Sequence, residues 1–192
     1  MDPTATDLRR VLVAYHSADG QTAKIAERIA ERLRQNRIAV ELLDVAHAPG
    51  PGGFDAVVVG DSIHAGHHSR ALTRWLTHHG EAIGRTPFAL FQVSLASAID
   101  DAVHAAEAHQ YLQQLLGATR VHPDIVGLFG GALAYTRYGW LKRRLMRSIA
   151  RRRGGPTDTG ADHEFTDWEA VDHFSDDVAR LIEVWHAADR SG

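Results

Sequence analysis

The first long apolar run of this chain stops at a short polar turn, and a helical pattern begins directly after it. The run covers residues 11–15, and apolar positions recur at helical spacing through residues 23–35. A buried strand that turns into a helix leaves unpaired N–H groups at the positive end of the helix dipole, which together bind a phosphate well. The residues predicted to surround this phosphate are Ser17, Ala18, Asp19, Gly20, Gln21 and Thr22.

The rest of the chain alternates strand and helix patterns at short spacing. Such alternation is typical of an α/β fold with a parallel sheet covered on both faces. The expected strands are residues 11–15, 39–44, 54–60, 88–93 and 125–133, and the expected helices are 23–35, one capped by Ser69, one from Asp100 to about Leu116, and one from the capping box at 166–169 to about His186. We therefore predict a doubly wound five-stranded sheet in a single domain spanning residues 1–192.

Composition narrows the chemistry that this domain can perform. None of the 192 residues is cysteine, so disulfides, thiol catalysis and cysteine-bound metals are excluded, and any redox chemistry needs a bound cofactor. The first eight residues lack the pattern of a signal peptide, and no apolar window is long enough to span a bilayer. We therefore expect a cytoplasmic protein.

Ligands of open parallel sheets bind beyond the carboxyl ends of the strands, where the strand order reverses. This rule predicts a site built from three loops, at residues 17–22, 61–68 and 94–97. The first loop has neither the glycine fingerprint of dinucleotide folds nor the lysine of a P-loop. A monophosphate fits better, and the small residues of the other loops allow a flat ring to lie against the backbone. FMN satisfies both conditions, although an ordinary strand–helix turn remains the alternative.

The segment from Asp19 to Thr22 is similar to the FMN-phosphate loop of flavodoxin-like proteins. More narrowly, the chain resembles the menaquinone-dependent protoporphyrinogen IX dehydrogenase family over about residues 11–182. The residues that carry the resemblance are Asp19–Thr22, Gly60, Ser62-Ile63, Gly66-His67, Gly131–Leu133, Arg137-Tyr138, Trp140, Gly154-Gly155, Thr157–Thr159 and Thr166–Glu169. Two departures are Ala18, where flavodoxin loops commonly have a hydroxyl residue, and the third loop, which keeps only part of the pattern.

The resemblance implies non-covalent FMN and electron transfer from a tetrapyrrole precursor to a membrane quinone. The isoalloxazine ring is expected to lie between the second and third loops. The residues implied there are Ser62, Ile63, His64, Ala65, Gly66, His67, Ser94, Leu95 and Ala96. The flavin N5 atom carries the chemistry in this interpretation, and the motif requires no acid or base from the protein.

A basic insertion is expected at about residues 134–164, before the last helix. Eight of the 21 basic residues lie between Arg137 and Arg153 and none of the 24 acidic residues does, so the remainder carries 13 basic against 24 acidic residues. The segment is amphipathic and could lie on an anionic membrane, at the inner face of the cell membrane, or bind the propionates of a porphyrinogen. It could equally be a solvated basic face. Its predicted contact residues are Arg137, Tyr138, Trp140, Lys142, Arg143, Arg144 and Arg147.

Three other functional classes are less consistent with the sequence. His64, His67, His68, His78 and His79 are close in the chain, but zinc requires three or four ligands with a supporting second shell and no cysteine is available, so no metal is predicted. There is no Gly-x-Ser-x-Gly elbow for a hydrolase. One basic helix on an acidic body is thin support for nucleic-acid binding, which is not expected. The alternatives that remain are a flavodoxin-like electron carrier or quinone reductase, and a binding module with FMN as a structural ligand.

Overall fold

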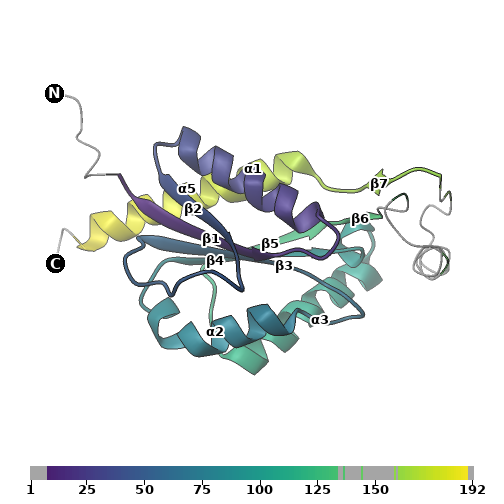
Figure 1. The fold of residues 1–192 in the computed structure, drawn as a ribbon, viewed down its shortest axis with the longest axis horizontal. Coiled ribbons are helices and arrows are strands. Elements are labelled where there is room, and N and C mark those ends of the chain that lie inside the picture. Colours follow the sequence, from purple (N-terminus) through teal and green to yellow (C-terminus); the bar gives the residue numbers. More distant parts are fainter. Residues whose placement is uncertain (1–7, 134–135, 137–143, 145–157, 159, 190–192) are drawn as a thin grey trace.

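The computed structural model describes residues 8–133, 136, 144, 158 and 160–189. Its elements are β1 (Arg10–His16), α1 (Gln21–Gln35), β2 (Ala39–Asp44), β3 (Ala56–Ser62), α2 (Arg70–Ile83), β4 (Phe88–Ser94), a 3₁₀ turn (Ala96–Ala98), α3 (Ala102–Thr119), β5 (Ile125–Gly130), β6 (Ala132–Leu133), β7 (His163–Glu164) and α5 (Trp168–Asp189). Strands β1 to β5 form one parallel sheet in the order β2-β1-β3-β4-β5. Helices α1 and α5 cover one face and α2 and α3 the other, which confirms the predicted fold (Figure 1).

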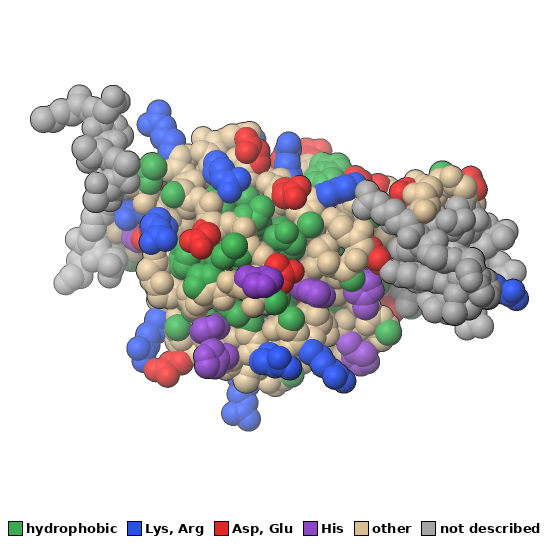
Figure 2. All heavy atoms as spheres, in the orientation of Figure 1, with side chains coloured by type: hydrophobic (Ala, Val, Ile, Leu, Met, Phe, Trp, Pro, Cys, Tyr) green, Lys and Arg blue, Asp and Glu red, His purple; other side chains and the backbone are tan. Residues whose placement is uncertain are grey.

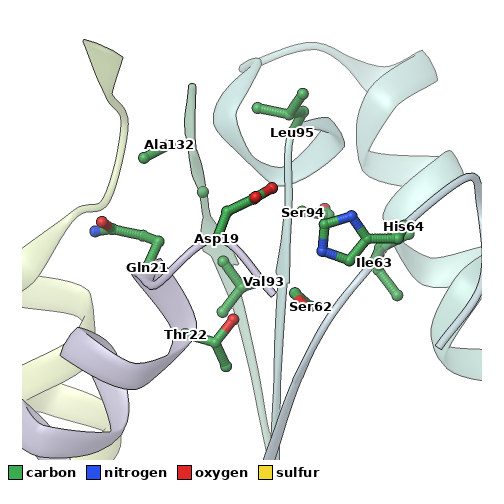
Figure 3. A pocket seen from close by; sticks show the side chains of 11 residues that line it. Asp19, Gln21, Thr22, Ser62, Ile63, His64, Val93, Ser94, Leu95 and Ala132 are labelled. Carbon is green, nitrogen blue, oxygen red and sulfur yellow. The ribbon is translucent and has the colours of Figure 1, made fainter. Parts of the chain in front are cut away.

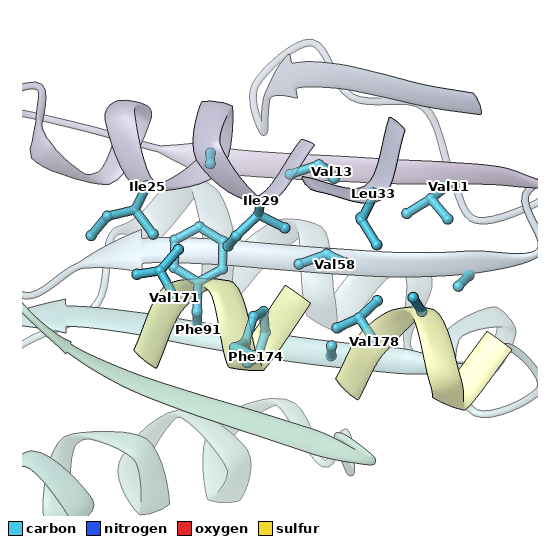
Figure 4. Packing of buried hydrophobic residues seen from close by; sticks show 14 of the residues in the cluster. Val11, Val13, Ile25, Ile29, Leu33, Val58, Phe91, Val171, Phe174 and Val178 are labelled. Atoms are coloured by element: carbon cyan, nitrogen blue, oxygen red, sulfur yellow. The ribbon is translucent and has the colours of Figure 1, made fainter. Parts of the chain in front are cut away.

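The α1/α5 side of the sheet holds an aliphatic core with an aromatic cluster inside it (Figure 4). The rings of Phe91, Phe129 and Phe174 have centroids between 5.6 and 6.2 Å apart, at the tilted and edge-on angles that aromatic pairs prefer. Gly60 is the cross-strand partner of Phe91, and a Cβ at Gly60 would lie 1.9 Å from the ring. The Phe91 ring therefore fills the place that a larger residue at position 60 would need.

The outer surface of this side carries a row of charges between α1 and α5. Arg28 donates two hydrogen bonds to Asp172, at 2.7 and 2.6 Å, and Arg32 donates two to Asp176, at 2.8 and 2.9 Å. These hydrogen bonds lower the pKa of each aspartate below its usual range. We refer to these four residues as the α1–α5 seam.

The α2/α3 side has an aliphatic core that includes Leu12, Leu72, Leu76 and Leu90, all fully buried. The space-filling view places histidines across the face formed by α2 and α3 (Figure 2). In the part of the chain that the structure describes, no helix is long and apolar enough to cross a membrane.

Most element boundaries differ from the sequence prediction by one to three residues, and the ends of α3 and the start of α5 differ for identifiable reasons. Helix α3 is capped by Asp101, whose side chain accepts the N–H of His104, and it continues through Gly117 to Thr119. The predicted stop at Gly117 is wrong because the left-handed residue that ends the helix is Arg120 (φ 57°). The N-terminal hydrogen bond of α5 comes from Asp167, which accepts the N–H of Ala170.

The sequence predicts one strand over residues 125–133, and the structure has two there, β5 and β6. Strand β5 ends at Gly130, where a Cβ would lie 2.4 Å from the carbonyl oxygen of Phe165. The chain then leaves the parallel sheet, and β6 pairs antiparallel with β7 through Ala132–Glu164 and Leu133–His163. This short β6–β7 ladder holds both ends of the insertion side by side.

Candidate functional site

A pocket lies at the carboxyl ends of β1, β3 and β4, where the strand order reverses (Figure 3). It is open to solvent, and the space between its walls, open solvent included, is about 520 Å³. The residues that line it are Asp19, Gln21, Thr22, Ser62, Ile63, His64, Val93, Ser94, Leu95, Gly131 and Ala132. All three loops that the sequence predicted contribute to this one pocket.

The first wall is the turn between β1 and α1. Gly20 is the N-cap of α1 in the left-handed conformation (φ 96°), which favours glycine. Its N–H donates to Ser17 Oγ at 3.1 Å, and the first intrahelical bond runs from Lys24 N–H to the Gly20 carbonyl at 3.2 Å. No side chain of the described residues caps the helix, so the N–H groups of residues 21–23 are presented to an anion at the positive end of the dipole.

The second wall is the segment between β3 and α2. Ser62 lines the pocket, and its Oγ is buried without a hydrogen-bond partner among the described residues. Beyond it, His64 and His67 close a tight turn by exchanging backbone hydrogen bonds of 3.0 and 3.1 Å. Ala65 (φ 50°) and Gly66 (φ 80°) at the centre both have positive φ, as in the type I′ turn. Of the two histidines, His64 lines the pocket and His67 does not.

The third wall is the end of β4. Ser94 is buried, and its hydroxyl accepts the N–H of Ser97 at 3.0 Å and lies 2.8 Å from Ser97 Oγ. The Ser94 carbonyl accepts the N–H of Gly131 at 3.1 Å. Leu95 places an apolar side chain at the rim opposite α1 (Figure 3). This wall therefore combines the apolar side chain of Leu95 with the hydrogen-bonded hydroxyl and carbonyl groups of Ser94.

The fourth wall, Gly131 and Ala132, was absent from the predicted site. A chain of hydrogen bonds ties it to the first wall: Gln21 Nε2 donates to Thr166 Oγ1, and Thr166 Oγ1 donates to the Gly130 carbonyl, both at 2.8 Å. The two adjacent glycines at the end of the fifth strand were the signal that the chain changes direction there. The phosphate-type turn and the base of the insertion are therefore parts of one site.

An ion pair between Lys24 and Glu164 closes this region from outside, at 3.1 Å. Burial opposes the charge on Glu164, but hydrogen bonds from Lys24 and Trp168 outweigh burial and lower the pKa of its carboxyl group. The side chains of this pair are 51% and 37% exposed, so it is a solvated contact beside the pocket and not a buried charge.

The predicted residues fall into three groups. Those that line the pocket are Asp19, Gln21, Thr22, Ser62, Ile63, His64, Ser94 and Leu95. Those that lie in the same loops without lining it are Ser17, Ala18, Gly20, Ala65, Gly66, His67 and Ala96. Among the predicted contacts of the insertion, Arg144 is exposed, and Arg137, Tyr138, Trp140, Lys142, Arg143 and Arg147 lie outside the described residues.

A buried polar network behind the second wall was not predicted. Asp61 is fully buried, and its Oδ2 lies 3.2 Å from His68 Nδ1 and accepts the N–H of Ser69 at 2.7 Å. His68 Nε2 lies 3.1 Å from Gln92 Oε1, and Gln92 Nε2 donates to the Ala108 carbonyl at 3.0 Å. We refer to Asp61, His68 and Gln92 as the buried network. Three histidines within one loop gave no indication that the last of them, His68, has a buried side chain.

Comparison with known proteins identifies the family of this chain. Residues 12–160 match the family model of the flavodoxin domain. The chain is 30% identical over 176 residues to the protoporphyrinogen IX dehydrogenase [quinone] of Escherichia coli (strain K12), covering 91% of this chain and 97% of that protein. It is 31% identical over 180 residues to the protein of the same name from Leishmania major, covering 92% and 78%. The chain belongs to this family of flavodoxin-domain proteins.

A solved flavodoxin from the domain Archaea has the same fold. It aligns with a TM-score of 0.53 and 15% identity, over 91% of this chain and 99% of that one. The fold and family predicted from the sequence are thus confirmed.

The residues of the pocket fit the cofactor that the sequence suggested. The uncapped start of α1 suits a terminal phosphate, with the hydroxyl of Thr22 beside it. The buried, unpaired Ser62 Oγ needs a hydrogen-bond partner, which a polar group on a bound ligand supplies. Ile63 and Leu95 provide apolar surface for a flat ring. Within the described residues, no three histidine or carboxylate side chains gather as a metal site.

Proposed function

We propose that the protein oxidises protoporphyrinogen IX to protoporphyrin IX, with FMN as its bound electron carrier and a quinone as the electron acceptor. The observation that carries the proposal is the match to the Escherichia coli dehydrogenase, which extends over nearly all of both chains. The pocket supports it because its donors suit a mononucleotide with a flat ring.

The flavin supplies the two-electron redox chemistry when it is bound. The residues of this chain bind and orient it. The N–H groups at the start of α1 hold the phosphate, and Gly20 lets the backbone approach it. Ser62 donates to or accepts from the cofactor, while Ile63 and Leu95 flank the ring and exclude water from its faces.

The proposal extends to the partners of the reaction. The acceptor is menaquinone or a similar membrane quinone, which requires the pocket to work close to a lipid surface. The insertion at residues 134–164 supports this because it gathers eight basic residues and no acid. It binds the anionic inner face of the cell membrane, the propionates of the porphyrinogen, or both.

An anaerobic assay with protoporphyrinogen IX and a menaquinone analogue tests the proposal. We expect quinone-dependent porphyrin fluorescence well above autoxidation. A protein that is yellow and reducible but gives no fluorescence above autoxidation contradicts the dehydrogenase assignment and leaves an electron carrier or quinone reductase.

A matched pair of variants connects the assay to the pocket. Thr22→Val removes a hydroxyl that lines the pocket, whereas Thr77→Val removes an exposed hydroxyl on α2 that donates to the Thr73 carbonyl. We expect Thr22→Val to weaken FMN binding by about tenfold, the value of one lost hydrogen bond to a charged group. Thr77→Val should bind FMN as the unmodified protein does; equal losses in both contradict the placement of the phosphate.

A further inference from the structure

The buried network places two hydrogen-bond acceptors against one histidine ring. Gln92 Nε2 donates to the Ala108 carbonyl, so the amide is oriented with Oε1 toward His68. An oxygen in that place accepts, and His68 Nε2 must therefore carry a proton. On the other side, His68 Nδ1 faces Asp61 Oδ2.

The second ring nitrogen requires a further proton. A neutral ring with its proton on Nε2 leaves a lone pair on Nδ1, which would face a carboxylate oxygen across 3.2 Å. One additional proton between Nδ1 and Oδ2 removes this repulsion. Asp61 Oδ2 also accepts the N–H of Ser69 at 2.7 Å, a hydrogen bond that favours the charged carboxylate, so we place this proton on the ring. His68 is then an imidazolium ion paired with the Asp61 carboxylate, in a place where the two side chains are 5% and 0% exposed.

The network is joined to the pocket through the backbone of the second wall. Asp61 is followed directly by the pocket residues Ser62, Ile63 and His64. At the other end of this segment, His68 and the N–H of Ser69 both bind Asp61 Oδ2. Residues on both sides of the segment from Ser62 to His67 are therefore held together at Asp61 Oδ2. Gln92, in β4, connects His68 to the Ala108 carbonyl in α3.

We propose that Asp61, His68 and Gln92 are positioning residues of the cofactor pocket: with a proton on each nitrogen of the His68 ring, the network closes the loop from Ser62 to His67 in the shape that binds the flavin ring. The part that concerns the flavin rests on the proposed function. The proton itself is a property of the chain without ligand.

Nuclear magnetic resonance of the histidine side chains tests the proton directly. In ¹⁵N-labelled protein at pH 7, without FMN, His68 should show protons on both ring nitrogens, and the signals should vanish in His68→Gln. A bare ring nitrogen on His68 overturns the proposal. Because the measurement needs neither FMN nor substrate, it stands even if the protein proves not to be a dehydrogenase.

Titration with FMN tests the positioning. We expect His68→Gln to raise the FMN dissociation constant by about tenfold. His109→Gln, the same exchange at an exposed site on α3, should change it by less than about twofold. Circular dichroism in each case establishes that the variant is folded at the temperature of the titration. A folded His68→Gln protein that binds FMN as tightly as the unmodified one overturns the proposal.

A second variant serves if His68→Gln does not fold. Gln92→Met has a similar size, removes the acceptor of the Nε2 proton and leaves the Asp61–His68 pair in place. We expect it to weaken FMN binding and to abolish the Nε2 proton signal, with unchanged binding counting against the proposal. Loss of porphyrin production with normal FMN binding and both ring protons present would contradict the proposed function alone.

Discussion

The two faces of the sheet place their charged side chains differently. On the α1/α5 side, the core is apolar and aromatic, and the ion pairs lie outside it in the α1–α5 seam. On the α2/α3 side, the Asp61–His68 pair that we propose to be charged lies inside, under the carboxyl end of the sheet and directly behind the pocket wall. The seam joins two helices by direct hydrogen bonds at the surface, whereas the buried network joins two strands and two helices in the interior.

The two kinds of charged contact differ in what they do: neither adds much to the stability of the fold, but the buried one restricts the local geometry. Exposed pairs gain little because water and salt screen them. A buried pair does not reliably stabilise a fold either, but breaking it is costly because it leaves one charge unpaired. A network of this kind therefore allows few geometries, which is valuable next to a ligand site and unnecessary between two surface helices.

The largest expected effect is the loss of one partner of the buried pair. Asp61→Ala leaves His68 without its counter-charge and should destabilise the protein by about 3–5 kcal/mol in urea unfolding. The double variant Asp61→Ala/His68→Phe, which removes both charges, should be less destabilised than Asp61→Ala. If the two losses simply add, the pair is not coupled and the contrast between the faces fails.

The next effect concerns the aromatic face. Gly60→Ala places a Cβ 1.9 Å from Phe91 Cζ and should cost about 1–3 kcal/mol through overpacking. Gly52→Ala is the matched control, because a Cβ there meets nothing within 4 Å, and it should change stability by less than about 0.5 kcal/mol. Equal unfolding midpoints for the two variants would mean that the Phe91 ring can move aside.

A smaller effect is expected in the turn at the pocket rim. Gly66→Ala forces a side chain into a left-handed conformation and should cost about 1–2 kcal/mol, since its contact with Tyr111 at 3.5 Å is an ordinary one. Ala65→Gly, at φ 50°, should relieve strain and not add to it. Thermal unfolding measures both, and a loss of stability in Ala65→Gly would contradict the positive-φ turn.

The smallest effect is expected in the α1–α5 seam. The lowered pKa values of Asp172 and Asp176 mean that their contribution is present above the usual value of 3.8 and is lost as pH falls through the lowered folded value. The double variant Asp172→Asn/Asp176→Asn should melt about 2–4 °C below the unmodified protein at pH 7. This gap should close below pH 3.8, and it should also narrow in high salt; a gap that persists in acid would assign the effect to packing.

The turn from β1 to α1 was predictable because everything that forms it is local. An apolar run, a glycine and a helical period are adjacent in the sequence, and Gly20 indeed occupies the left-handed cap. The end of α3 was less predictable, because a Cβ at Gly117 would meet nothing within 4 Å, so the fold does not require glycine there, and the buried Thr119 and Val121 lie beyond it. Choosing between Asp100 and Asp101 as its cap depends on a one-residue difference that the pattern does not contain.

The buried network and the fourth wall could not be read from the sequence for another reason. Asp61 and Gln92 are cross-strand partners, and they meet His68 only after the sheet has formed. Thr166 looked like the helix cap, but its hydroxyl is used to join Gln21 to Gly130, across 145 and 36 residues of chain. Contacts of that range are set by topology, and a local pattern does not record them.

The β6–β7 ladder has a consequence for how this fold can change. Its two residue pairs fix the ends of the insertion beside each other, so the number of residues between them does not enter the geometry of Gly131 and Ala132. Each doubling of a flexible segment between two fixed ends costs only about 0.6 kcal/mol in closure entropy. The ladder is therefore a position at which the fold tolerates insertion and deletion. The sequence between Leu133 and His163 can be lengthened, shortened or exchanged while the rest of the domain keeps its structure.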